Sequence, residues 1–143
     1  MSNTLRLALV VLVPVMLLAA LAYAAEEKET EQKIPWQTDI EAALANGEES
    51  GTPSLLYFTA DWCPPCKQMK KTTWVDDSVV AALEDYTPVY IDADSQPQVL
   101  QSYGVSAIPT IVLVDPAGEE LFRTVGYVEA KALVATLDKH AGE

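Results

Sequence analysis

The two cysteines of this chain, Cys63 and Cys66, lie in the run TADWCPPCK, which spans residues 59–67. Two thiols at this spacing can form and break a disulfide without movement of the backbone. If a helix begins here, unpaired backbone N–H groups and the helix dipole favour a thiolate at Cys63. Lys67 adds a nearby positive charge, which Asp61 opposes. We therefore expect Cys63 to attack a disulfide, and Cys66, buried one turn further on, to resolve the mixed disulfide.

Two other uses of the cysteine pair must be weighed. A zinc site takes four ligands as a rule, and the other soft candidate is His140, three residues from the C-terminus. A structural disulfide across so short a loop would stabilise the fold little. Redox chemistry is therefore the favoured interpretation, and we expect neither a metal nor a cofactor.

The N-terminus has the pattern of an export segment. Residues 1–6 carry the terminal amine and Arg6, and residues 7–25 form an uncharged apolar run that includes Ala22-Tyr23-Ala24. Small residues around one larger residue are typical of signal peptidase sites. A run of this length can also just span a bilayer. We expect residues 1–24 to be a signal peptide or a membrane anchor. The protein would be exported to the periplasm, either soluble after cleavage or anchored by residues 7–25.

The chain is acidic, with 21 acidic against 9 basic side chains and a net charge of −12. All the acidic residues follow residue 25. This balance argues against nucleic acid or anionic lipid as a partner, so we expect membrane contact only through an N-terminal anchor. Residues 25–35 are rich in glutamate and predict a solvated linker. Residues 36–143 are then left for one folded domain.

The remaining pattern predicts alternating helices and strands. Thr38 and Glu41 form a capping-box pair for a helix that ends near Asn46-Gly47. Asp76-Asp77-Ser78 offers caps for a later helix, and Ser95 is a candidate cap further on. The predicted helices cover residues 38–45, 65–73, 77–85, 97–103 and 128–139, and the predicted strands cover residues 54–59, 110–114 and 119–125 and the surroundings of Val89 and Ile91. The turn at residues 115–118 joins the last two strands as a hairpin. We expect an α/β fold with a mixed sheet and helices on both faces.

Three separated features resemble the thioredoxin superfamily. They are the motif at residues 60–67 after a strand, Ile108-Pro109-Thr110 before a later strand, and Gly126 between the last strand and the last helix. The resemblance covers about residues 36–140. Within it, residues 57–83 are similar to the C-terminal periplasmic domain of DsbD-type thiol-disulfide reductases.

The resemblance implies a thioredoxin fold and a substrate groove. In this family the proline that matches Pro109 is cis and faces the dithiol, and the backbone that matches Ile108 pairs with an extended substrate. Trp62, Ile108, Pro109 and Gly126 would then line the groove, whereas Met69 and Trp74 are expected to be packing residues. The implied partners are protein disulfides or dithiols and an upstream thiol-disulfide electron donor.

The sequence departs from this family behind the dithiol. Thioredoxins usually carry a buried aspartate six residues before the first cysteine, where this chain has Tyr57. Tyr90 replaces the lysine that often pairs with that aspartate, and Lys70 replaces a glutamate of DsbD-like domains. The usual proton acceptor is thus missing, and water or Asp61 is expected to serve. We expect Tyr57 to be a packing residue with a hydrogen-bonded hydroxyl, since a phenol pKa near 10 is too high for a base.

The sequence therefore predicts an exported thiol-disulfide oxidoreductase that reduces other exported proteins. An oxidase or isomerase uses the same residues, because small changes in the contacts of the sulfur atoms decide the direction of electron flow. A module that binds or assembles partners without turnover is the alternative from another class, although it would have no need of two cysteines.

Overall fold

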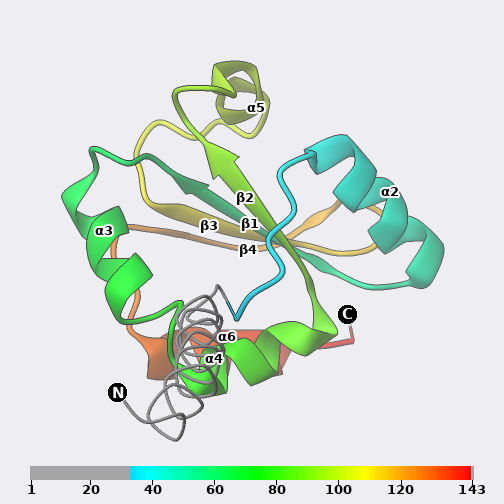
Figure 1. Ribbon diagram of the computed structural model, residues 1–143. Helices are drawn as coiled ribbons and strands as arrows, with labels where there is room; N and C mark the ends of the chain where they lie inside the picture. Colours follow the sequence, from blue (N-terminus) through cyan, green and yellow to red (C-terminus); the bar gives the residue numbers. More distant parts are fainter. Residues whose placement is uncertain (1–32, 143) are drawn as a thin grey trace, which may run out of the picture. The chain divides into compact units, whose positions relative to one another are not determined.

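The computed structural model describes residues 33–142 (Figure 1). The expected signal peptide or anchor at residues 1–24 and most of the expected linker lie outside the described residues. Ile34, which the sequence places in the linker, is buried in the core. None of the helices among the described residues is long and apolar enough to cross a membrane.

A four-stranded sheet forms the centre of the described domain. Its strands are β1 (Ser54–Thr59), β2 (Thr87–Asp92), β3 (Thr110–Val114) and β4 (Glu120–Val125), in the order β2-β1-β3-β4. Strand β1 runs parallel to β2 and antiparallel to β3, and β3 and β4 form an antiparallel hairpin. The predicted mixed sheet and hairpin are confirmed.

Helices cover both faces of this sheet, as predicted. They are α2 (Ile40–Ser50), α3 (Pro64–Lys71), α4 (Asp77–Ala82), the short 3-10 helix η1 (Leu83–Asp85), α5 (Pro97–Ser102) and α6 (Ala130–His140). Helices α3, α4 and α6 lie on one face, and α2 and α5 lie on the other (Figure 1). Side chains of β1 alternate between these layers: Leu55 and Tyr57 pack on the α3 side, and Leu56 and Phe58 pack on the α2 side. Strand β1, which carries the cysteine turn at its end, is therefore fixed from both faces.

Helix α2 differs from its predicted form at both ends. Asp39, not Thr38, caps it, because the Asp39 carboxylate accepts a hydrogen bond from the Ala42 N–H at 3.0 Å. The helix continues through Asn46-Gly47 and ends at Gly51, whose φ of 70° is left-handed. Gly47 lies inside the helix, and a Cβ atom there would lie 2.8 Å from the carbonyl oxygen of Thr52. This glycine permits close backbone packing and does not stop the helix.

The other predicted boundaries hold to within a few residues. Asp76 caps α4 as predicted and accepts a hydrogen bond from the Ser78 N–H at 2.9 Å. Ser95 does not cap α5. Its N–H donates instead to the Asp92 carboxylate at 3.0 Å, so Ser95 belongs to the turn that follows β2. Helix α6 begins at Ala130, two residues later than predicted, and packs Leu133 and Leu137 into the core.

Candidate active site

The dithiol lies where β1 leads into α3. The chain leaves the sheet after Thr59, and Cys63 is the N-cap of α3 with Pro64 and Pro65 in the first turn. Proline is favoured there because its missing N–H would have no helical partner. Cys63 and Cys66 form a disulfide with a Cα–Cα distance of 5.3 Å, and the Cys66 N–H points to Cys63 Sγ with an N–S distance of 3.4 Å. The same N–H can stabilise a thiolate at Cys63 when the pair is reduced.

Both sulfur atoms are well covered. Cys63 and Cys66 are 2% and 0% exposed, and they pack with Ala60, Ala93 and Ile108. Cys63 Sγ lies 3.7 Å from the carbonyl oxygen of Ile108. The peptide bond between Ile108 and Pro109 is cis, as the resemblance implied. A segment 45 residues further along the chain therefore lies against Cys63 Sγ.

Trp62 and Gly126 complete the set that the sequence singled out. Trp62 is 63% exposed, so it is a surface residue beside Cys63 and not a core tryptophan. Its indole Nε1–H donates to the Asp94 carboxylate at 3.0 and 3.2 Å. Gly126 has a φ of 97°, and its N–H donates to the carbonyl oxygen of Pro109 at 2.8 Å. The fold thus brings residues from three distant segments to one edge of the dithiol.

Sequence reasoning missed three neighbours of this set. Asp94 fixes the Trp62 indole, whereas Val125 and Tyr127 are exposed hydrophobic residues on either side of Gly126. The Tyr127 hydroxyl lies within hydrogen-bond distance, 3.2 Å, of Thr72 Oγ1. Two apolar side chains that flank a glycine at a strand end are only weak sequence evidence for a binding surface. Only the pairing of β4 with β3 places them near Pro109.

An aromatic cluster lies on the α3 side of the sheet. The rings of Trp36, Tyr57, Trp74 and Tyr90 contact one another, with Tyr57 and Trp74 centroids 4.7 Å apart. Tyr57 and Trp74 are buried, which confirms them as packing residues, as is Met69. The Tyr57 hydroxyl makes no hydrogen bond of ordinary geometry: among the described residues this hydroxyl, Thr59 Oγ1 and Trp74 Nε1 are buried without such a bond. Thr59 and Trp74 nevertheless lie close enough to the hydroxyl to act on its pKa as hydrogen-bonding groups.

Tyr57 is not a proton acceptor at this site. Burial raises the pKa of Tyr57 above its ordinary value, although the polar side chains of Thr59 and Trp74 oppose that shift. A base must have a pKa near the operating pH to accept a thiol proton efficiently. The phenol therefore stays protonated, and its role is to fill the aromatic cluster.

Lys70 and Asp61 form an ion pair next to this cluster. Lys70 Nζ lies 2.7 Å from Asp61 Oδ1 and 5.4 Å from the centre of the Tyr90 ring. The hydrogen bond from Lys70 holds the pKa of Asp61 below its ordinary value. Burial alone would lower the pKa of Lys70, but the Asp61 carboxylate and the Tyr90 phenol raise it to about 12. Asp61 is thus a weaker base than a free carboxylate, which disfavours it as the acceptor for Cys66.

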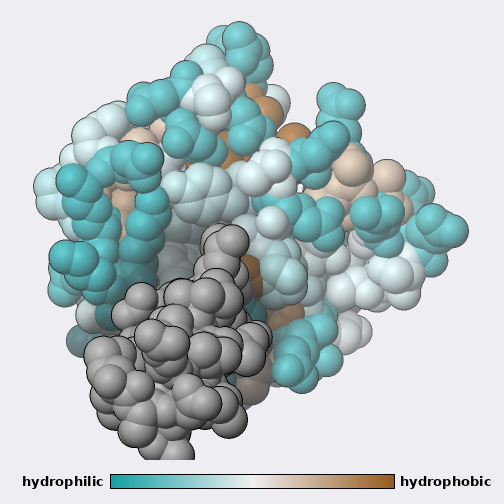
Figure 2. All heavy atoms as spheres, in the orientation of Figure 1, coloured by the Kyte–Doolittle hydropathy of each residue, from teal (hydrophilic) through white to brown (hydrophobic). Residues whose placement is uncertain are grey.

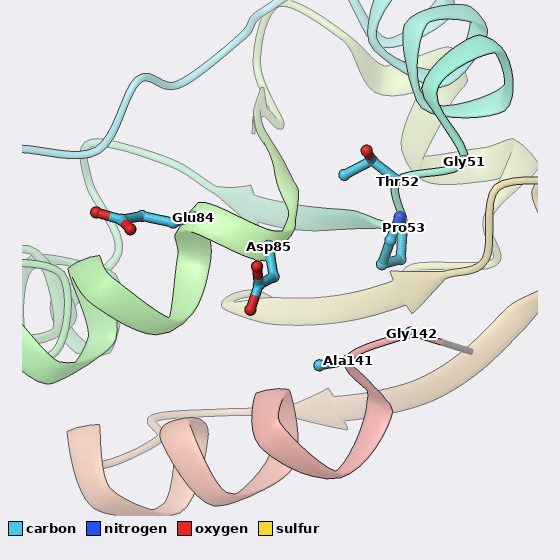
Figure 3. A pocket seen from close by; sticks show the side chains of 7 residues that line it. All are labelled: Gly51, Thr52, Pro53, Glu84, Asp85, Ala141 and Gly142. Carbon is cyan, nitrogen blue, oxygen red and sulfur yellow. The ribbon is translucent and has the colours of Figure 1, made fainter.

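The hollow drawn in Figure 3 is separate from the dithiol. It is lined by Gly51, Thr52, Pro53, Glu84, Asp85, Ala141 and Gly142. Pro53 precedes β1, whereas the cysteine turn follows the other end of that strand. Within residues 33–142, no group of three or more histidine, cysteine, aspartate and glutamate side chains is arranged to hold a metal ion. His140 lies on α6 with its ring 6.0 Å from that of Phe122.

Comparison with known proteins gives a consistent result. Residues 36–141 match the model of the Thioredoxin-like domain family. Thioredoxin of Chlamydia trachomatis is 37% identical over 86 residues, which cover 60% of this chain and 80% of the relative. The thiol:disulfide interchange protein DsbD 1 of Pseudomonas aeruginosa is 31% identical over 116 residues, or 77% of this chain and 20% of the relative. The chain thus spans about a fifth of the length of that relative.

Solved structures agree on the fold. A thioredoxin from Thermus thermophilus superimposes with a TM-score of 0.66 at 26% identity and covers 75% of this chain and 86% of its own. The oxidised C-terminal domain of DsbD from Neisseria meningitidis superimposes with a TM-score of 0.64 at 24% identity, covering 73% of this chain and 97% of its own.

Proposed function

Since this chain belongs to the thioredoxin-like family and is a thiol-disulfide oxidoreductase, we propose that it is exported and reduces disulfides of other exported proteins. The position of Cys63 carries this proposal. Its sulfur caps α3, accepts the Cys66 N–H at 3.4 Å and lies next to the carbonyl oxygen of Ile108. A thiolate there is stabilised by the helix terminus and lies beside backbone that an extended substrate can pair with.

The proposed reaction begins with the Cys63 thiolate. It attacks one sulfur of the substrate disulfide, so that a mixed disulfide forms and the first substrate sulfur leaves as a thiolate. The Cys66 thiol then loses its proton and attacks Cys63 Sγ, which breaks the mixed disulfide and releases the second substrate sulfur. Two electrons have passed to the substrate together with the proton of Cys66, and the second proton, which Cys63 lost to solvent when it ionised, returns to the substrate from solvent. The protein is left with the Cys63–Cys66 disulfide, and an upstream dithiol donor must reduce it again.

The proton of Cys66 needs an acceptor other than a buried carboxylate. Tyr57 stays protonated, and Asp61 is held by Lys70. The first substrate thiolate to leave has an ordinary thiol pKa of about 8.5, which makes it a suitable base close to the site. We assign the transfer from Cys66 to that departing thiolate or to water. Resolution of the mixed disulfide is then coupled to the departure of the substrate sulfur.

The groove proposed for the substrate consists of Trp62, Ile108, Pro109 and Gly126. The backbone N–H of Gly126 already bonds to Pro109, which leaves the backbone of Ile108 beside Cys63 for an added strand. The exposed ring of Trp62 and the exposed side chains of Val125 and Tyr127 give this edge an apolar character. Such a surface suits a segment of a partly unfolded protein whose disulfide is accessible.

The direction of electron flow is tested by the reduction potential of the Cys63–Cys66 pair. Equilibration with reduced and oxidised glutathione is expected to give a value nearer to about −270 mV than to about −120 mV, because the first is typical of thioredoxin and the second of a strong oxidant. A value near the oxidising end would replace the reductase with an oxidase, and an intermediate value would favour an isomerase.

Export is proposed from the N-terminal pattern. The uncharged run at residues 7–25 and the Ala22-Tyr23-Ala24 pattern support a signal peptide or an anchor. A fusion of residues 1–35 to an alkaline phosphatase lacking its own signal is expected to be active in a Gram-negative host, because this enzyme folds only where its disulfides can form. The same fusion with Leu12→Arg and Leu17→Arg is the matched control and is expected to lose that activity. An inactive fusion of the unaltered segment would place the protein inside the cell.

A further inference from the structure

Lys70 is the charged side chain of α3 that shares a face with the resolving cysteine. It follows Cys66 by four residues, so the two side chains lie one turn apart. Its amine is held in place by Asp61 at 2.7 Å and by the Tyr90 ring at 5.4 Å. Lys70 therefore holds a positive charge one helical turn after Cys66. Lys67 and Lys71 are exposed instead, and the outer surface of α3 is hydrophilic (Figure 2).

Asp61 does not cancel this charge for groups inside the protein. The side chain of Asp61 is 86% exposed, whereas that of Lys70 is 36% exposed. Water screens an exposed charge more strongly than a partly buried one. The ion pair therefore presents a net positive field toward the interior, where Cys66 is fully buried.

Other ionisable groups surround the dithiol on each side. The neighbouring segment at residues 106–109 carries none. Tyr57, within the sheet, stays neutral because burial raises its pKa. Asp94 is bonded to the Trp62 indole, and Asp92 accepts N–H groups of its own turn at 2.8 and 3.0 Å. Among the described residues, the ionisable side chains on these neighbouring segments are Lys67, Lys70 and Lys71 of α3, Asp61 before it, Tyr57 of β1, Tyr90, Asp92 and Asp94 of β2 and its turn, and Tyr127 after β4.

We propose that Lys70 raises the reduction potential of the dithiol by stabilising the thiolate form of the reduced pair. Lys70 acts through its charge as a positioning residue and does not accept a proton. This inference rests on the proposed function, because it concerns the same two cysteines. According to this proposal, the charge of Lys70 shifts the equilibrium between dithiol and disulfide toward the dithiol.

The effect on the redox balance follows from linkage. In the glutathione equilibrium, the protein dithiol and oxidised glutathione convert to the protein disulfide and two molecules of reduced glutathione, with two electrons and two protons conserved. A charge that stabilises a thiolate stabilises only the reduced protein, since a disulfide does not ionise. Removal of the Lys70 charge therefore raises the thiolate pKa and shifts this equilibrium toward the protein disulfide.

The test is the variant Lys70→Met, which keeps an unbranched side chain over Tyr90 but removes the charge. We expect its equilibrium constant with glutathione to move toward the disulfide by about threefold or more. The pH at which thiolate absorbance at 240 nm appears on the reduced protein should rise. Lys70→Arg keeps the charge and should remain close to the wild type. The matched control is Lys71→Met, which removes the same charge from the next residue of α3 and should change the constant by less than about twofold.

Two results would overturn the inference. One is a constant and a thiolate pKa for Lys70→Met that equal those of the wild type. The other is a shift in Lys71→Met as large as that in Lys70→Met, since the effect would then be a general one of net charge. Urea unfolding of each oxidised variant shows whether it folds. If Lys70→Met does not fold, Lys70→Gln takes its place, because it also removes the charge. The glutathione equilibrium needs no protein substrate. Inactivity of the wild type toward protein disulfides would therefore refute the proposed function without touching this inference.

Discussion

The variant Cys63→Ser is expected to reduce insulin disulfides, with dithiothreitol as electron source, no faster than dithiothreitol alone. A serine hydroxyl at this position cannot replace the thiolate that attacks the substrate disulfide. The N-cap position of Cys63 stays occupied by a good capping residue, because serine also accepts N–H groups at helix starts. The variant should therefore fold normally, and the loss should be one of chemistry alone. Turnover measured by insulin precipitation is the readout.

The companion variant Cys66→Ala separates attack from resolution. It is expected to retain attack and to accumulate a mixed disulfide with its substrate, visible as a higher mass on non-reducing gels that dithiothreitol removes. Sustained turnover by Cys63→Ser would contradict the assigned roles. If Cys66→Ala trapped nothing, while the double variant Cys63→Ser with Cys66→Ala still captured a protein, the chain would be a binding module.

The variant Tyr57→Ala is expected to lose about 3–5 kcal/mol of unfolding free energy, because it leaves a cavity among Trp36, Trp74 and Tyr90. The matched variant Tyr57→Phe keeps the ring and removes a buried hydroxyl that has no partner among the described residues. It is expected to lie within about 1 kcal/mol of the wild type or to be more stable. Urea unfolding of the oxidised proteins measures both.

The contrast between these two variants decides what Tyr57 contributes. A loss in Tyr57→Phe as large as that in Tyr57→Ala would mean that the hydroxyl is bonded and structural. We also expect Tyr57→Phe to reduce insulin at the wild-type rate, since the phenol stays protonated. A clear fall in its turnover would give the hydroxyl a part in proton transfer.

Local sequence predicted most of the fold for identifiable physical reasons. Strands β1 and β3 are short apolar runs buried on both sides, and such runs form central strands irrespective of detail. The Asp76 cap and the turn at residues 115–118 use side chains that act within a few residues. The predicted end of α2 was wrong because Gly47 does not stop the helix. It lies instead against Thr52 and Ser54 of the next segment. A glycine that ends a helix and one that admits a close neighbour look the same in sequence.

At the active site, the sequence alone predicts the reactive pair, its place at a helix start and the proline that faces it. These features depend on the spacing of Cys63 and Cys66, on prolines in a first turn and on motifs with strong family resemblance. The groups that surround them could not be predicted in this way. The ion pair between Lys70 and Asp61 joins residues 9 positions apart, and the hydrogen bond from Trp62 to Asp94 joins residues 32 positions apart. The burial of the Tyr57 hydroxyl depends on the packing of four aromatic rings from separate segments. Packing sets these contacts, and with them the charge around the dithiol, because a field in a protein depends on distance and burial and not on position along the chain.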